Sequence, residues 1–176
     1  MFKQKLNVRK LMAAGTAALA IGAASSTDAA TATSNLSVTA SVTANCTIAT
    51  APVAFGAYDP VSANATTALN GTGTVSVTCT NGASTTVTLG QGSNPAGGST
   101  AAAPARRLKD AGTDLLTYSL YSDTGRTTVW GDTAGTGVAH TGTGTLTALT
   151  VYGAVDPGQN VPAGSYSDTV VATITF

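Results

Sequence analysis

One segment near the N-terminus alternates apolar and polar residues for longer than a single short strand requires. It is residues 35–48, NLSVTASVTANCTI, in which Leu, Val, Ala, Cys and Ile take every second position. Successive side chains of an extended chain point to opposite faces, so the pattern predicts a strand with one buried face. A typical strand has roughly five or six residues. The first half of the segment therefore needs a pairing partner of its own.

The residues before this segment have the pattern of a secretory signal peptide. A basic stretch at 1–10 precedes an apolar run at 11–24, and small residues follow. The run is too short to span a membrane comfortably, although a retained N-terminal anchor is the alternative. We place cleavage between Ala29 and Ala30, so the signal peptide is residues 1–29; a site at 30–32 would also serve.

Cleavage changes the net charge of the chain, and the charge that remains limits the classes of partner it can bind. The processed protein keeps four basic side chains and seven aspartates and has no glutamate, which gives a net charge of −3. Without a basic stripe, nucleic acid and anionic lipid are unsuitable partners. Thr, Val, Ala, Gly and Ser dominate, and strong helix formers are scarce. The composition indicates an all-β, extracytoplasmic protein.

The two cysteines, Cys46 and Cys79, both lie in the secreted part. In an oxidising compartment an even pair predicts a disulfide. A zinc site is not expected, because two cysteines and the single His140 do not supply enough ligands.

Short extended segments separated by turn residues fill the rest of the processed chain, a single domain of about 147 residues. Asn81-Gly82 predicts a hairpin turn, and 90–105 and 131–145 are expected to be loops. Seven or so strands at this spacing indicate an antiparallel sandwich. The segments with strand pattern after residue 48 are 52–56, 73–79, 85–89, 115–121, 127–130, 146–152 and 166–176. On the last of them one face carries Val170, Ala172, Ile174 and Phe176.

Catalysis finds little support in this sequence, and no cofactor or metal is expected. His140 lies in a Gly/Thr-rich stretch and is interpreted as a solvated loop residue. The aspartates sit mostly beside Gly, Pro, Ser or Thr, where Asp serves turns. The basic cluster 106–110 is interpreted as an exposed loop edge rather than a docking patch. Trp130 and Tyr121 are expected to cap a sandwich core, with sugar stacking as the alternative.

The chain resembles the spore coat U domain proteins, a group that includes subunits of archaic chaperone–usher pili. The resemblance covers essentially the whole processed chain and is most specific at its C-terminal end. The residues that carry it are the signal peptide and alternating segment up to Cys46, Phe55-Gly56, 58–60, 75–79, Arg107-Leu108, 116–123, Arg126, Trp130-Gly131, Tyr152-Gly153, Gln159, 161–170 and 174–176.

The resemblance implies an immunoglobulin-like sandwich that lacks one strand. Residues 30–44 would then form a donor segment, of which 33–43 fill the gap in a neighbouring subunit, and 45–176 would form the domain. The donor side chains would be Leu36, Val38, Ala40 and Val42, and the strand bearing Val170, Ala172, Ile174 and Phe176 would edge the gap.

The expected partners are further copies or sibling subunits, a periplasmic chaperone and an outer-membrane usher, with export through the periplasm to the cell surface. Two other functions stay open. One is a self-contained secreted sandwich in which 36–48 is a long edge strand. The other is a carbohydrate-binding adhesin, although such a tip protein normally needs a second domain.

Overall fold

The computed structural model describes residues 28–176. Most of the predicted signal peptide, residues 1–27, lies outside the described residues. The described part of the chain contains no helix long and apolar enough to cross a membrane. Residues 28–40 and 41–176 are separate units, so each is described by itself.

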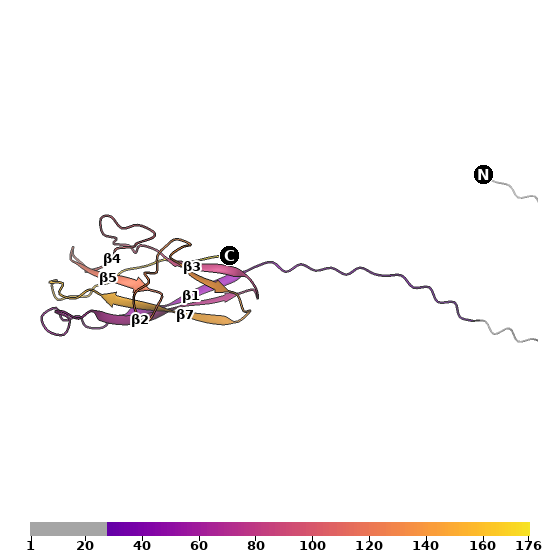
Figure 1. The fold of residues 1–176 in the computed structure, drawn as a ribbon, viewed down its shortest axis with the longest axis horizontal. Helices are drawn as coiled ribbons and strands as arrows, with labels where there is room; N and C mark the ends of the chain where they lie inside the picture. Colours follow the sequence, from indigo (N-terminus) through magenta and orange to yellow (C-terminus); the bar gives the residue numbers. More distant parts are fainter. Residues whose placement is uncertain (1–27) are drawn as a thin grey trace, which may run out of the picture. The chain divides into compact units, whose positions relative to one another are not determined.

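Residues 41–176 form eight strands in two antiparallel sheets (Figure 1). The larger sheet has the order β1-β2-β7-β5-β4, and the smaller has the order β6-β3-β8. The strands are β1 (Cys46–Ala54), β2 (Leu69–Cys79), β3 (Ser84–Leu89), β4 (Arg106–Lys109), β5 (Leu115–Tyr121), β6 (Val138–Thr141), β7 (Leu146–Val155) and β8 (Ala172–Thr175). The predicted all-β class is confirmed.

The core lies between the two sheets and follows the alternation of the sequence. Every second residue of β5, namely Leu116, Tyr118 and Leu120, is buried, as are Val75 and Val77 in β2. The core is completed by Val87, Leu89, Trp130, Val151 and Val155. A period of two in the sequence thus predicted the buried face of the central strands correctly.

The Asn81-Gly82 turn does not make the predicted hairpin. The turn itself forms, since the Ala83 N–H donates to the Thr80 carbonyl at 3.0 Å and Gly82 has a φ of 79°. However, β2 and β3 belong to different sheets, because β1 and β7 already occupy both edges of β2. Turn residues specify a reversal of the chain, but not the edge that the next strand joins.

The last predicted strand, 166–176, is also shorter than expected. Only β8 is a strand, and Ser167 makes a single bridge to Lys109 at the edge of the larger sheet. Five residues later Ala172 pairs with Leu89 in the smaller sheet. The chain therefore changes sheets between 167 and 172, and a strand that leaves one sheet for another cannot stay regular.

Two predicted loops contain strands. His140 lies in β6, where its carbonyl accepts a hydrogen bond from Thr85 Oγ1 at 2.8 Å, so it is not a solvated loop residue. The basic cluster forms β4 instead of an exposed loop edge, and Arg106 is fully buried. Conversely, the predicted strand 127–130 makes only one bridge, between Val129 and Tyr121.

Candidate binding groove

An open groove lies between β1 and the C-terminal segment, which we define as residues 161–172. It consists of two cavities. The smaller, of about 200 Å³, lies along β1 from Thr50 to Val53 and is bounded opposite by Val170 and Ala172. The larger, of about 720 Å³, extends past Phe55 to Pro60 and is bounded opposite by residues 161–168.

The floor of the groove is apolar and comes from the core strands. In the smaller cavity it includes Val75, Leu120 and Val151, and in the larger it includes Leu116 and Val155. Each of these side chains belongs to the hydrophobic core, which is therefore accessible along the groove. A groove with an apolar floor can bury the apolar face of a ligand.

Both strands beside the groove have an unpaired edge in the described part of the chain. In the larger sheet β1 pairs only with β2, and in the smaller sheet β8 pairs only with β3. Seven of the nine residues of β1 are exposed, including Ile48, which the alternation predicts to be buried. Free strand edges beside an apolar groove form a template for the addition of another strand.

A buried arginine holds the end of β3 beside the groove. Arg106 donates from Nε to the Gly90 carbonyl at 2.8 Å and from Nη2 to the carbonyls of Leu89, at 2.7 Å, and Trp130, at 2.9 Å. Burial lowers the pKa of its guanidinium, and Tyr118, Asp168 and Asp132 oppose that effect. The sequence analysis missed this role, because nothing in the run RRLK distinguishes a buried arginine from an exposed one.

Within the described part of the chain, Asp168 is the one charged residue in the lining of the two cavities. It lines both cavities and accepts hydrogen bonds from Tyr118 Oη at 2.7 Å and from the Ser93 N–H at 2.8 Å. Burial, followed by this hydrogen bond, raises the pKa of Tyr118, so the phenol stays protonated and donates to the carboxylate. The interaction fixes the C-terminal segment over β5.

The ring of Phe55 lies over two glycines in the larger sheet. A Cβ added to Gly71 would come within 2.9 Å of the ring, and one added to Gly153 within 2.7 Å. These two glycines pair across β2 and β7. The ring also contacts Tyr118 edge to face, with centroids 5.9 Å apart. Glycine inside a strand often marks such a close approach, so Gly71 and Gly153 were a signal that the sequence analysis did not use.

The structure places three of the four residues predicted to edge the gap next to the core. Val170 and Ala172 line the smaller cavity, and Ile174 packs against the core. Phe176, however, is 55% exposed and does not line either cavity. Trp130 is completely buried and donates from Nε1 to the Val87 carbonyl, so its ring is inaccessible to a sugar.

The N-terminal segment, residues 30–44, forms no strand and is exposed along its length. The large side chains of its apolar face, Leu36, Val38 and Val42, are 87%, 85% and 84% exposed. Such apolar side chains gain most from a partner that removes them from water.

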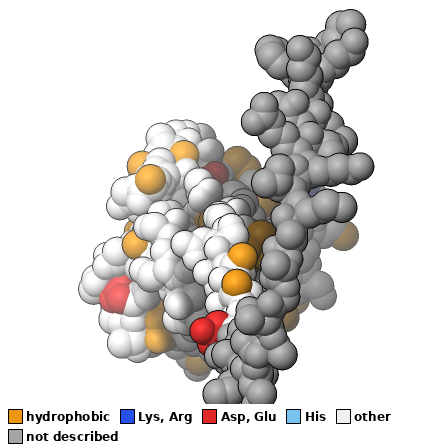
Figure 2. Space-filling model, turned by 90° about the vertical axis from the view of Figure 1, so that its right-hand side faces the viewer, with side chains coloured by type: hydrophobic (Ala, Val, Ile, Leu, Met, Phe, Trp, Pro, Cys, Tyr) orange, Lys and Arg blue, Asp and Glu red, His pale blue; other side chains and the backbone are white. Residues whose placement is uncertain are grey.

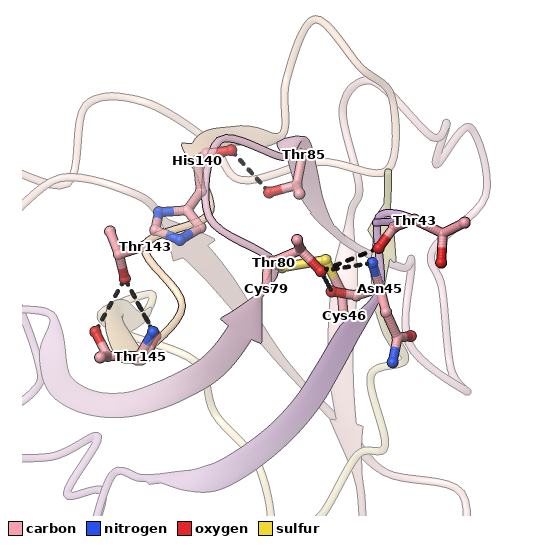
Figure 3. Close-up of a disulfide and its surroundings, with 9 residues drawn as sticks. All are labelled: Thr43, Asn45, Cys46, Cys79, Thr80, Thr85, His140, Thr143 and Thr145. Atoms are coloured by element: carbon pink, nitrogen blue, oxygen red, sulfur yellow. Dashed lines mark hydrogen bonds between the residues drawn. A yellow bond between two sulfur atoms is a disulfide. The ribbon is translucent and has the colours of Figure 1, made fainter. Parts of the chain in front are cut away.

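The chain joins the sheet directly after this segment, at the predicted disulfide. Cys46 and Cys79 are bonded, and they are paired residues of β1 and β2. Beside them Thr80 Oγ1 accepts from the Asn45 N–H at 3.0 Å and donates to the Thr43 carbonyl at 3.5 Å (Figure 3). Regular pairing thus begins at Cys46.

Removing this disulfide is expected to destabilise the protein without changing the groove. The double variant Cys46→Ser/Cys79→Ser should lose roughly 3–4 kcal/mol of unfolding free energy, because the bond closes a loop with a sequence separation of 33. Urea unfolding of both proteins measures the difference, and the wild type under reducing conditions is the matched control. Equal unfolding midpoints would contradict the prediction.

The part of the surface drawn in Figure 2 carries little charge. On the face drawn in Figure 2, acidic side chains are few and widely spaced among uncharged surface. Several of the aspartates serve turns, as predicted: Asp59 accepts from the N–H groups of Val61 and Ser62, and Asp123 from those of Thr127 and Thr128.

Known proteins resemble this chain in sequence and in fold. The family model described as Spore Coat Protein U domain matches residues 32–173. "Protein U" of Myxococcus xanthus is 49% identical in an alignment covering 96% of this chain and 98% of that protein. The fold is similar to that of a chain in the CsuC–CsuE chaperone–tip adhesion subunit pre-assembly complex from archaic chaperone–usher Csu pili of Acinetobacter baumannii. That likeness has a TM-score of 0.55 at 20% identity, and it covers 77% of this chain and 40% of the other.

Proposed function

Because the chain belongs to the Spore Coat Protein U domain family, and because its domain carries an open groove beside two free strand edges, we propose that it is a structural subunit of a secreted surface fibre. Residues 33–43 of one copy would lie in the groove of the next as an added strand. The role is one of assembly rather than catalysis.

The groove is the observation that carries this proposal. A sandwich whose core is accessible along one side, between two unpaired edges, is incomplete in the way that one extra strand would repair. The N-terminal segment has the matching pattern, with apolar side chains at every second position and polar ones between them. The similarity of the fold to that of a chain in a pilus pre-assembly complex agrees with the proposed function.

The apolar face of the N-terminal segment would supply part of the free energy of such an assembly. Burial of Leu36, Val38 and Val42 contributes about 1.5–3 kcal/mol each, or roughly 5–9 kcal/mol before the cost of ordering the segment. Main-chain hydrogen bonds to β1 and β8 add to this. Because the donor and the groove are different surfaces, the contact does not close on itself, and repeated contacts produce a fibre.

The same geometry defines the other partners that we propose. An unfilled groove exposes core side chains, so a periplasmic chaperone would cover it before assembly, and an outer-membrane usher would export the subunits. Processing of residues 1–29 would deliver the chain to the periplasm, and the finished fibre would lie on the cell surface.

The assembly state of the processed protein tests this function. Residues 30–176, purified after release from any chaperone, are expected to form a ladder of oligomers in size-exclusion chromatography and filaments in negative-stain images. The reason is that each copy offers both a donor and a groove. A clean, stable monomer would instead support the self-contained secreted sandwich.

A further inference from the structure

The two cavities of the groove adjoin, because they share part of their lining. Four residues line both of them: Val53 and Phe55 on the side of β1, and Leu108 and Asp168 on the side of the C-terminal segment. We call these four residues the waist. A strand that occupies the whole groove has to cross the waist, so the space there limits which side chain it can carry at that point.

The β1 side of the waist is held in place by its surroundings. The ring of Phe55 is packed between Tyr118 and the glycine pair Gly71 and Gly153, where even an added Cβ would collide with it. Val53 lies equally close, since a Cβ on Gly153 would come within 2.8 Å of its Cγ1. Side chains packed this tightly cannot move deeper into the sheet to admit a larger group.

The opposite side of the waist is also fixed. Asp168 is held by hydrogen bonds from Tyr118 Oη and the Ser93 N–H. Leu108 lies in β4, where it pairs with Leu116 of β5, and it packs partly buried against the core. Both walls are therefore set by the fold of the domain rather than by the ligand.

Only one of the four donor side chains is small. Ala40 stands between Val38 and Val42, and Leu36 precedes them. Residues two apart in a strand are about 6.7 Å apart on the same face. With Ala40 at the waist, a valine on each side enters one of the two cavities.

Resting on the proposed function, we infer that the waist fixes the register of assembly. Ala40 of one copy lies at the waist of the next, Val38 fills the smaller cavity and Val42 enters the larger one. Ala40 is thus the specificity-determining residue of the donor, because each of the other three donor side chains, Leu36, Val38 and Val42, would place a branched side chain against Phe55.

We take the direction of the added strand from β8, to which it would be antiparallel. It would then run parallel to β1, which passes from the smaller cavity at Thr50 towards the larger one. Every pair in the smaller sheet is antiparallel, and the C-terminal segment runs from the larger cavity at residue 161 to the smaller at Ala172. A donor antiparallel to β8 runs the other way, so its earlier residue Val38 reaches the smaller cavity and its later residue Val42 the larger.

Enlarging the residue at the waist tests the register. Ala40→Phe in the processed chain is expected to slow oligomer formation roughly ten- to a hundredfold, as overpacking of a rigid site does. Thr39→Phe carries the same ring on the opposite face and should assemble at the wild-type rate. Since residue 40 lies outside the domain, both variants should unfold at the wild-type temperature. Equal assembly by both variants would overturn the register.

Cross-linking gives an independent test of the register. The variant Ala40→Cys/Leu108→Cys should form disulfides between copies during assembly, seen as a ladder on a non-reducing gel. Val38→Cys/Leu108→Cys is the matched control and should cross-link far less. A stronger ladder from the control would overturn the register and leave the proposed function intact. Absence of oligomers in the wild type would overturn both.

Discussion

A single aspartate at position 38 is expected to prevent assembly, whereas the same substitution at position 39 is not. In Val38→Asp a carboxylate would have to enter the apolar groove, where the accessible floor comes from Val75, Leu120 and Val151. Burial of an unpaired charge costs several kcal/mol, which is comparable with the whole gain from the donor side chains. Oligomers of Val38→Asp should therefore fall at least about a hundredfold.

Thr39→Asp is the matched control, because it adds the same charge to the same segment on the face that points away from the groove. It should form ladders and filaments as the wild type does. Deletion of residues 30–43 gives the result expected for a chain without any donor. That chain should stay monomeric while a chaperone holds it and should aggregate, without forming filaments, when it is released. Filaments of the deletion variant would contradict the proposed function.

The effect of each substitution on folding has to be measured separately from its effect on assembly. Residue 38 is 85% exposed and lies outside every strand, so its substitution should leave the unfolding temperature of the unassembled domain unchanged. An unchanged yield of polymer from Val38→Asp, with a folded domain, would show that the donor face does not include this residue.

Local pattern was sufficient to predict the central strands but not their arrangement. The buried faces of β2 and β5 follow from strict alternation, because a half-buried strand repeats every two residues. The assignment of β2 and β3 to different sheets and the change of sheet between Ser167 and Ala172 depend on which edges are already occupied. Occupied edges are a long-range property that no short window of sequence contains.

The groove was predicted in outline and missed in detail. The family resemblance implied a missing strand, and two of the residues expected to edge the gap, Val170 and Ala172, line the smaller cavity. The waist was not predicted, because Phe55 meets Gly71 and Gly153 only after β1, β2 and β7 have paired. The only local indication of the waist in the sequence was the presence of Gly71 and Gly153 within strands. Glycine weakens a strand and often marks a position where another group packs closely.

Replacement of Arg106 by methionine is expected to cause the largest loss of domain stability. The guanidinium is fully buried and donates to three backbone carbonyls, those of Leu89, Gly90 and Trp130. Methionine keeps much of the apolar stem but leaves these acceptors without partners, at a cost of about 1–3 kcal/mol each before relaxation. We expect Arg106→Met to lose about 3–5 kcal/mol of unfolding free energy, measured by urea unfolding of the chaperone-free, assembly-deficient Val38→Asp background.

The neighbouring Arg107 provides the control for this experiment. It lies in the same strand, is only half-buried, and donates to the carbonyls of Asn94 and Pro95 in a loop. Arg107→Met removes the same charge and two similar hydrogen bonds but leaves acceptors that water can reach, so it should cost less than about 1 kcal/mol. Equal losses in the two variants would mean that net charge, rather than the buried bonds of Arg106, stabilises the end of β3. A much larger loss at Arg106 would instead show that its buried hydrogen bonds stabilise the end of β3, where Leu89 lines the groove.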